Sequence, residues 1–217
     1  MSGTRAERAT QTRARLIAAG RALFAEQGFA ATSTEQILLQ AGTTRGGLYH
    51  HFTDKADLFA AVCEQLHAEA DAAITAAVAA AASRGADAFA TLVAGGDAWL
   101  DHMSAPDVRR ILVIEAPTVL GWERWNAQDH RHGFDQLRAG IRAAQIEGRL
   151  PAIPTDDLAI LLNGAMNYAV MMARGPDTAA QLKRTKVALH AVLAALRTQA
   201  ESTPPTSRSD ETDPGAA

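Results

Sequence analysis

The sequence has few of the residues that several functional classes require. Among 217 residues there is one cysteine, Cys63, so no internal disulfide can form, which favours a reducing, cytoplasmic compartment. Aromatic residues make up only 5% of the chain, and no run of 18 apolar residues occurs, so neither a membrane span nor a membrane partner is expected. The first residues are polar and Arg-rich, so a secretory signal is not expected either.

The chain also lacks the motifs of common enzymes. It contains no P-loop, no dinucleotide glycine pattern and no paired nucleophile and base, so neither an enzyme nor a cofactor is expected. Metal-ligand residue types do cluster in residues 122–135, at Asp129, His130, His132 and Asp135. Residues two apart on a helix point in different directions, whereas ligation from one helix favours a spacing of four. We therefore expect no metal site and interpret this segment as a solvated polar face.

Charge is distributed unevenly along the chain. The net charge is −3, but residues 1–60 hold seven Lys/Arg and five Asp/Glu, whereas residues 61–217 hold 14 and 19. Five arginines and one glutamate lie within residues 1–21. A basic end on an acidic body suits a small DNA-reading domain joined to a larger domain with another role. A solvated basic N-terminus with no partner is the alternative.

Apolar residues recur at helical spacing throughout, and no useful β alternation occurs, so we predict an all-α protein. The composition divides the chain into a three-helix head with a helix-turn-helix (residues 1–53), a larger helical domain for ligand binding and dimerisation (54–200), and a disordered polar tail (201–217). Pro117 is expected to stop one helix, and Thr155 or Asp156 to cap another. The expected helices run to about residue 27 and over 33–42, 44–51, 54–82, 86–103, 106–116, 122–147, 155–173 and 177–199.

The head contains the strongest local signals. Gly28 can end the first helix in a left-handed conformation, and Ser33 with Gln36 forms a capping-box pattern for the second. Gly42 can end that helix, and Thr44 can cap a third helix of about two turns. Two short helices joined by a tight turn within about 45 residues are typical of a helix-turn-helix.

The segment TRGGLYHHF, residues 44–52, has the chemistry of a recognition helix. Leu48 and Phe52 are expected to face the core, leaving Arg45, Tyr49 and His50 to reach bases or phosphates. Gly46 and Gly47 would remove side chains where helix and DNA come close. Lys55 is disfavoured by the dipole in the first turn of the next helix, unless a phosphate docks there. A half-exposed rim or a loop is the alternative.

Residues 24–59, FAEQGFAATSTEQILLQAGTTRGGLYHHFTDKADLF, resemble the head of the TetR family of bacterial transcriptional regulators. This resemblance implies a dimeric, all-helical repressor that binds a palindromic operator in double-stranded DNA and takes a small-molecule inducer in its C-terminal domain. Gly47 departs from the Thr or Ala that is frequent in relatives, and Thr43 from the usual Val. The resemblance places DNA contacts at Thr32 or Ser33 and at Thr44, Arg45, Gly47, Tyr49, His50 and Lys55.

Two segments near the C-terminus are candidates for a dimer interface. Residues 155–173 and 177–199 each present apolar residues at helical spacing, and two such helices from each subunit would form a four-helix interface. The alternative is that both helices pack on their own subunit. The candidate interface residues are Leu158, Leu162, Ala165, Met172, Leu182, Leu189, Leu193 and Leu196.

Large apolar side chains in the middle of the chain are candidates for a ligand pocket that would take an apolar or amphipathic molecule. An ordinary helical core explains each of them equally well. Asn163 and Asn167, one helical turn apart, would contact a ligand or bond across the dimer. A ligand-independent DNA binder and a helical interaction module remain the competing functions. The candidate pocket residues are Trp99, Met103, Ile111, Ile114, Trp122, Trp125, Phe134, Leu137 and Met166.

Overall fold

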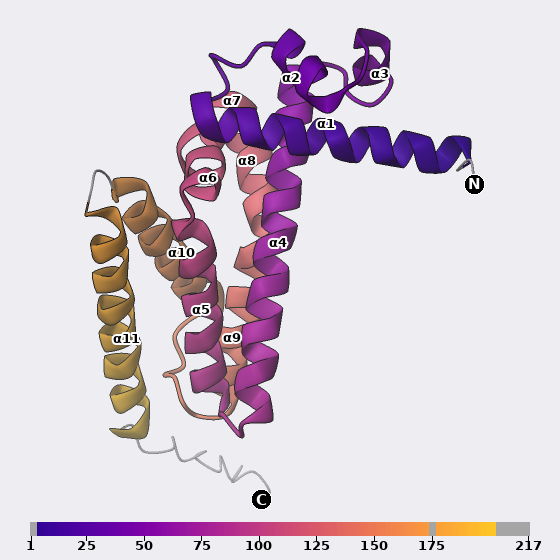
Figure 1. Cartoon of the computed structure of the whole chain (residues 1–217). Helices are drawn as coiled ribbons and strands as arrows, with labels where there is room; N and C mark the ends of the chain where they lie inside the picture. The colour runs from indigo at the N-terminus through magenta and orange to yellow at the C-terminus, as the bar shows by residue number, and fades with distance from the viewer. Residues whose placement is uncertain (1–3, 174–176, 203–217) are drawn as a thin grey trace, which may run out of the picture.

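The computed structural model describes residues 4–173 and 177–202, and within them every regular element is helical (Figure 1). This confirms the predicted all-α fold. A small head of three helices sits on one end of an elongated helical body, and a single long helix, α4, runs from the head down the length of the body (Figure 1). The predicted boundary at residue 54 therefore falls just before a helix that belongs to both parts.

The head consists of α1 (Arg5–Gln27), α2 (Thr34–Ala41), α3 (Arg45–Tyr49) and the first turns of α4 (Lys55–Ser83). The predicted caps of α2, α3 and α4 are confirmed, whereas Gly28 ends α1 with φ of 86° and ψ of 168°, outside the predicted left-handed helical conformation. Ser33 and Gln36 form both bonds of a capping box, and the Thr44 hydroxyl accepts from the Gly47 amide. Gly42 is left-handed, with φ of 60°, and Asp54 caps α4. These short-range bonds fix where each head helix begins and ends.

In the body, the described residues form nine further helical elements. Figure 1 shows α5 between α4 and the pair α10 and α11, with α11 along the outer edge. Two of the elements are π-helical. In order, they are α5 (Ala88–Ser104), α6 (Pro106–Val108), η1 (Arg109–Glu115), α7 (Ala116–Leu120), α8 (Trp122–Asp129), η2 (His130–Phe134), α9 (Asp135–Ile146), α10 (Thr155–Met172) and α11 (Thr178–Ser202).

Three details of the body differ from the sequence-based prediction. Pro117 does not stop a helix but lies in the first turn of α7, which follows η1 without a break. Residues 122–147 do not form one regular helix, because η2 separates α8 from α9. Neither Thr155 nor Asp156 caps α10: the N-cap is Pro154, which makes no side-chain cap bond.

One hydrophobic core continues from the head into the body. It includes Leu16, Phe24 and Leu48 in the head, and it extends through α4 to Trp99 and Val170. Cys63 is fully buried within it, as a small apolar residue would be, and burial raises the pKa of its thiol. A second core joins α5, α9, α10 and α11 at the far end of the body.

None of the helices in the described part of the chain is both long and apolar enough to cross a membrane. The tail predicted over residues 201–217 lies outside the described residues from 203 onward. The proposed division into head and body remains a prediction, since the shared core couples the two parts through α4.

Candidate nucleic-acid interface and ligand cavity

The short helix α3 presents polar side chains outward from a buried base. Leu48 is 1% exposed and Phe52 is 3% exposed, and they fix the helix on the head core as predicted. On the other side Arg45, Tyr49 and His50 are exposed, with Tyr49 at 51%. The guanidinium, phenol and imidazole are therefore accessible to a partner outside the head.

Arg45 is held by a surface ion pair. Its Nη2 lies 2.8 Å from Glu35 Oε1 of α2, and both side chains are about two-thirds exposed, at 66% and 68%. Such exposed pairs contribute only about 0–1 kcal/mol to stability. A phosphate or guanine can therefore replace Glu35 at little cost, and the pair leaves Arg45 available to DNA.

Two residues predicted to contact DNA are engaged inside the head. Thr32 is 1% exposed, and its hydroxyl donates to the Gly28 carbonyl at 2.7 Å, so the prediction of a side-chain contact there is wrong. Ser33 remains partly exposed and is the candidate of that pair. Lys55 Nζ donates to the carbonyls of Phe29 and Thr32 at 2.8 and 2.7 Å and lies 4.2 Å from the Phe29 ring centroid.

The position of Lys55 therefore has a structural reason that the sequence did not reveal. Its ammonium ties the loop before α2 to the start of α4, and the carbonyls supply the negative partners that a phosphate was expected to provide. The two glycines also differ from each other. A Cβ on Gly46 would come no closer than 3.9 Å to a neighbour, Thr44 Oγ1, whereas one on Gly47 would lie 2.5 Å from Thr43 Oγ1. Gly47 is thus matched to Thr43 within the head.

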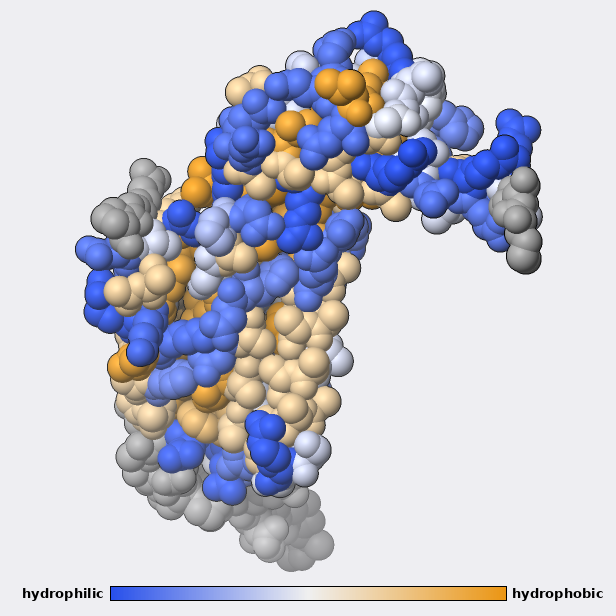
Figure 2. All heavy atoms as spheres, viewed as in Figure 1, coloured by the Kyte–Doolittle hydropathy of each residue, from blue (hydrophilic) through white to orange (hydrophobic). Residues whose placement is uncertain are grey.

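The basic N-terminus forms the first half of α1. Figure 1 shows this part of the helix projecting beyond the rest of the head, and Figure 2 shows hydrophilic residues along it and over the head. Arg5, Arg8 and Arg15 are exposed. Arg13 lies over the Phe52 ring, 5.3 Å from its centroid. The positive charges and the exposed side of α3 thus occupy the same small part of the molecule.

A cavity of about 490 Å³ lies in the body between α4, α5, η2, α9 and α10. This volume is within the range of about 300–1,000 Å³ that is usual for small-molecule sites. Of the predicted pocket residues, Trp99, Leu137 and Met166 line this cavity, and so does Asn163. The remaining lining residues are Ile74, Thr75, Val78, Ala79, Thr91, Leu92, Gly95, Gly96, Gly133, Gln136, Ala139 and Gly140.

Six residues predicted for the cavity lie elsewhere. Met103 and Ile111 are buried in the main core, and Phe134 is buried in the second core. Ile114 and Trp122 are exposed, at 42% and 67%. Trp125 donates from Nε1 to the Leu112 carbonyl, outside the lining. The prediction was wrong because it assumed that the largest side chains line a cavity, whereas large side chains usually fill the space between helices.

The signal that the sequence analysis missed is a set of glycines within helices. Gly95 and Gly96 lie in α5, Gly133 in η2 and Gly140 in α9, although glycine disfavours helix by about 1 kcal/mol. A Cβ on Gly140 would lie 3.0 Å from Leu92, and one on Gly133 would lie 3.1 Å from Trp99 Nε1. Glycine at these positions lets α5, η2 and α9 approach their neighbours closely around the cavity.

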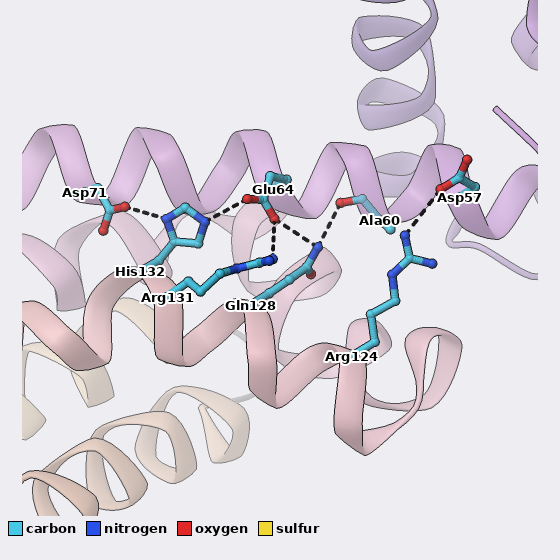
Figure 3. Close-up of polar contacts among 8 residues, drawn as sticks. All are labelled: Asp57, Ala60, Glu64, Asp71, Arg124, Gln128, Arg131 and His132. Atoms are coloured by element: carbon cyan, nitrogen blue, oxygen red, sulfur yellow. Dashed lines mark hydrogen bonds and ion pairs between the residues drawn. The ribbon is translucent and has the colours of Figure 1, made fainter. Parts of the chain in front are cut away.

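A row of polar contacts, called the ladder below, joins α4 to α8 and η2 (Figure 3). Near the head, Arg124 pairs with Asp57 at 3.3 Å. In the middle, Gln128 donates to Glu64 and to the Ala60 carbonyl. The last steps are made by His132, whose ring nitrogens lie 3.1 Å from Glu64 Oε1 and 2.5 Å from Asp71 Oδ2.

This ladder corrects the prediction of a solvated polar face in residues 122–135. Gln128 and Asp129 are buried, and His132 is held between two carboxylates. Burial raises the pKa of Asp129, whose carboxylate accepts from Asn163 Nδ2. Burial acts to lower the pKa of His132, but its hydrogen bonds to Asp71 and Glu64 outweigh this effect and raise it. Among the described residues no group of three or more His, Cys, Asp or Glu is placed to hold a metal ion.

The other π-helix, η1, makes hydrogen bonds to the head. Arg110 Nη1 donates to the carbonyls of Ala25 and Glu26, at the end of α1. Glu115 accepts from the Phe29 amide at 2.7 Å and pairs with Arg110. The end of α1 is therefore bonded to the body through η1, and Arg21 of α1 also pairs with Asp107 of α6 at 2.8 Å.

The predicted interface residues divide into three groups. Leu158, Leu162, Leu182 and Leu193 are at most 7% exposed within their own subunit, so the prediction that they form a dimer interface is wrong for these four. Leu189 and Leu196 are partly buried against the core. Ala165 and Met172 are exposed. Beside them the structure exposes Ile160, Leu161 and Tyr168 on α10 and Val187 and Val192 on α11.

Comparison with known proteins agrees with both parts of the molecule. Residues 16–62 match the family model described as bacterial regulatory proteins, tetR family. Residues 89–196 match the model described as tetracyclin repressor-like, C-terminal domain. The first match covers the helix-turn-helix, and the second covers the body beyond α4 and most of the cavity lining.

Individual proteins extend this agreement. A TetR-family transcriptional regulator of known structure from Pectobacterium atrosepticum is 34% identical, with a TM-score of 0.72 over 90% of this chain and 98% of that one. The Transposon Tn10 TetC protein of Escherichia coli is 26% identical over 175 residues, 81% of this chain and 86% of that protein. The HTH-type transcriptional regulator AcrR of Shigella flexneri is 41% identical over 58 residues, 27% of each chain.

The chain belongs to the TetR family of transcriptional regulators. It is a DNA-binding regulator with a helix-turn-helix head and a ligand-binding helical body, and it is not an enzyme.

Proposed function

We propose that the protein is a homodimeric repressor that binds a palindromic operator through two copies of α3 and leaves it when an uncharged small molecule fills the cavity of the body. The exposed group formed by Arg45, Tyr49 and His50 on a helix anchored by Leu48 is the observation that carries the proposal. These side chains have the donors and acceptors that read base edges and phosphates.

The uncovered apolar residues of α10 and α11 support the dimer. Ile160, Leu161 and Tyr168 are 56%, 69% and 60% exposed, and Gly164 and Ala165 lie between them on the same helix. A second copy of this face would cover the apolar side chains and let the helices approach closely. Two half-sites in successive major grooves require two heads about 34–36 Å apart, or a multiple of that distance.

The dimer proposal predicts which exposed residues matter. Tyr168→Glu should convert the dimer to a monomer at micromolar concentration, because a charge would have to be buried in the interface. Ile146→Glu is the matched control, since Ile146 is 78% exposed but lies on α9. Sedimentation velocity distinguishes the two states. A Tyr168→Glu variant that stays dimeric would place the interface elsewhere.

The polar ladder supports the coupling between cavity and head. Gly133 and Gln136 line the cavity, and Gln136 donates to Asp71, the carboxylate that also binds His132. An occupant that displaces η2 therefore acts on α4 through these bonds, and α4 carries Asp57, which accepts from the Thr53 amide next to α3. The occupant must prefer the released arrangement by its own differential affinity, since otherwise the equilibrium does not shift.

The DNA-binding part is tested on the DNA upstream of the gene. Arg45→Ala should weaken binding by about 5- to 150-fold and reduce the dependence of log affinity on log salt by about one contact. The control is Arg138→Ala, which removes an equally charged side chain from α9 in the body. Fluorescence anisotropy at several salt concentrations measures both quantities. Equal losses for the two variants would mean that α3 does not carry recognition.

The coupling is tested with N-phenyl-1-naphthylamine, a neutral apolar probe. Its binding should weaken the DNA complex of the unmodified protein, and Glu64→Gln should abolish this effect while leaving probe binding intact. Glu123→Gln is the control, because Glu123 is exposed and is not part of the ladder. If the probe still weakens DNA binding in both variants, the ladder is not the route of coupling.

A further inference from the structure

The cavity has an unusual balance of polar groups. None of its lining residues is charged, and the two nearby carboxylates that lie behind it, Asp71 and Asp129, are bonded to His132, Gln136 and Asn163. An anion would find no cation in the lining, and a cation would have to break these bonds to reach a carboxylate. Burial of an unpaired charge costs several kcal/mol. The lining therefore selects against charged molecules.

Most polar groups of the lining are already used. The Asn163 amide donates to Asp129, and its oxygen accepts from Asn167. The Thr91 hydroxyl donates to the Ala88 carbonyl. Gln136 Nε2 donates to Asp71 Oδ1 at 3.0 Å, and because a carboxylate only accepts, this bond assigns the amide orientation. These groups contribute to the framework of the cavity and offer few new bonds to an occupant.

The indole of Trp99 is the exception among the buried residues of the lining, since Thr75, whose hydroxyl also makes no hydrogen bond within the described residues, is exposed. Trp99 is 6% exposed, and within the described part of the chain its Nε1 makes no hydrogen bond. The group that lies against this edge is Gly133: a Cβ there would be 3.1 Å from Nε1 and 3.2 Å from Cδ1. Any other residue at position 133 would cover the N–H. Glycine at this point of η2 keeps a donor uncovered at the cavity wall.

A buried indole N–H normally finds an acceptor, because an unmade hydrogen bond costs about 1–3 kcal/mol. Trp125 shows the ordinary arrangement, with its Nε1 3.1 Å from the Leu112 carbonyl. Both tryptophans belong to the same body, but only Trp99 lines the cavity and only Trp99 lacks an acceptor. The contrast points to an acceptor supplied from outside the chain.

We propose that the cavity binds an uncharged, mainly apolar molecule with an oxygen acceptor, such as an aryl ketone, and that Trp99 Nε1 donates to this oxygen through the opening left by Gly133. This inference rests on the proposed role of the cavity as the ligand site. It adds the chemical class of the ligand, and it identifies Trp99 Nε1 as the group that distinguishes this class from molecules without an acceptor. The apolar part of the molecule would lie against Ile74, Val78 and Met166.

Three compounds with the same ring system separate the effect of an oxygen acceptor from the effect of a charge. 2-Acetylnaphthalene has an acceptor, 2-ethylnaphthalene has none, and 2-naphthoate has acceptors and a charge. Isothermal titration calorimetry should give binding of the ketone about 3- to 10-fold tighter than of the hydrocarbon, as expected for one neutral hydrogen bond. The naphthoate should bind more weakly than either. Naphthoate that binds as tightly as the ketone would overturn the proposal, as would binding of none of the three.

Substitutions test whether Trp99 Nε1 is the atom that causes the preference for the ketone. Trp99→Phe should bind 2-ethylnaphthalene as before but lose the preference for the ketone, and Gly133→Ala should lose it too. Trp125→Phe is the matched control, since it removes an indole that already has an acceptor, and it should keep the full preference. A ketone preference that survives in Trp99→Phe would overturn the assignment.

DNA binding measured in the same samples separates this inference from the proposed function. Protein that binds DNA but shows no ketone preference would overturn the ligand class and leave the repressor intact. Protein that shows the preference but keeps its DNA when the ketone binds would confirm the ligand class and refute the proposed release.

Discussion

Head and body use their polar groups in opposite ways. In the head the bonds that cap the helices join residues three apart: Ser33 with Gln36, and Thr44 with Gly47. In the body they join residues far apart in the chain, such as Asp71 and His132, separated by 61 positions. A local bond specifies a helix end wherever that helix lies, whereas a long-range bond specifies which helices meet. The head can therefore keep one shape while the body changes from one regulator to another.

The largest expected effect tests whether the head depends on its own small core. Leu48→Ala should lower the free energy of unfolding by about 2–5 kcal/mol, because a fully buried leucine leaves a cavity. DNA binding should fall with it. Urea unfolding and anisotropy measure the two effects. Leu39→Ala is the control, since Leu39 is 85% exposed in the same head and should change neither.

A smaller effect distinguishes structure from DNA contact at Lys55. Lys55→Met should lower the free energy of unfolding by about 1.5–3 kcal/mol, because two charge-assisted hydrogen bonds to the Phe29 and Thr32 carbonyls are lost. Thermal unfolding without DNA is the measurement. Unchanged stability together with a reduced salt dependence of DNA binding would instead identify Lys55 as a phosphate contact.

In the body, the stacked imidazoles of His67 and His132 make stability sensitive to pH. Burial lowers the pKa of His67 from 6.5 to about 4, so between these values the unfolded chain binds more protons than the folded one. The free energy of unfolding should therefore fall as pH decreases through this window, by at most about 1.4 kcal/mol per pH unit.

His67→Phe keeps an aromatic ring against His132, 5.3 Å away in the native pair, and removes the titrating group. The difference in unfolding free energy between the two proteins should lose its slope below about pH 4 and above about pH 6.5. Urea titrations between pH 4 and 7 give this difference. The raised pKa of His132 acts above this window, with stability lost as pH rises, and is present in both proteins.

The smallest expected effect concerns the surface of the head. Glu35→Gln should change the free energy of unfolding by less than about 1 kcal/mol, because its pair with Arg45 is exposed. DNA affinity should rise severalfold, since a negative charge near the phosphates is removed. Asp101→Asn, at an exposed ion pair of the body, should leave DNA affinity unchanged. A loss of affinity in Glu35→Gln would show that the pair positions Arg45 for recognition.

This difference between local and long-range bonds also explains what could be predicted from the sequence. The capping residues Ser33, Thr44 and Asp54 located the helices of the head to within a few residues, because each acts on its own first turn. The resemblance of the head to the TetR family supplied the function. In the body, helices were predicted but not their partners, so Leu158 and Leu182 were assigned to a dimer interface although they lie inside the subunit.

The cavity shows most clearly what could not be predicted from the sequence. Three of its residues were predicted from size and hydrophobicity, but its walls also contain glycines on three elements, whose close approach only the folded chain reveals. Similarly, the π-turn η2 directs His132 toward two carboxylates of α4, more than 60 residues away in the sequence. A periodicity of 3.6 residues contains no information on such an interruption.

The first half of α1 affects how fast and how strongly the protein binds a charged polymer. It is a capped helix and not a loose peptide, with Arg5, Arg8 and Arg15 on one side at spacings of three and seven. An unstructured arm would lose the freedom of every backbone bond on adsorption, roughly 1–2 kcal/mol per residue. Here that ordering precedes the encounter, and only three flexible side chains remain to be immobilised.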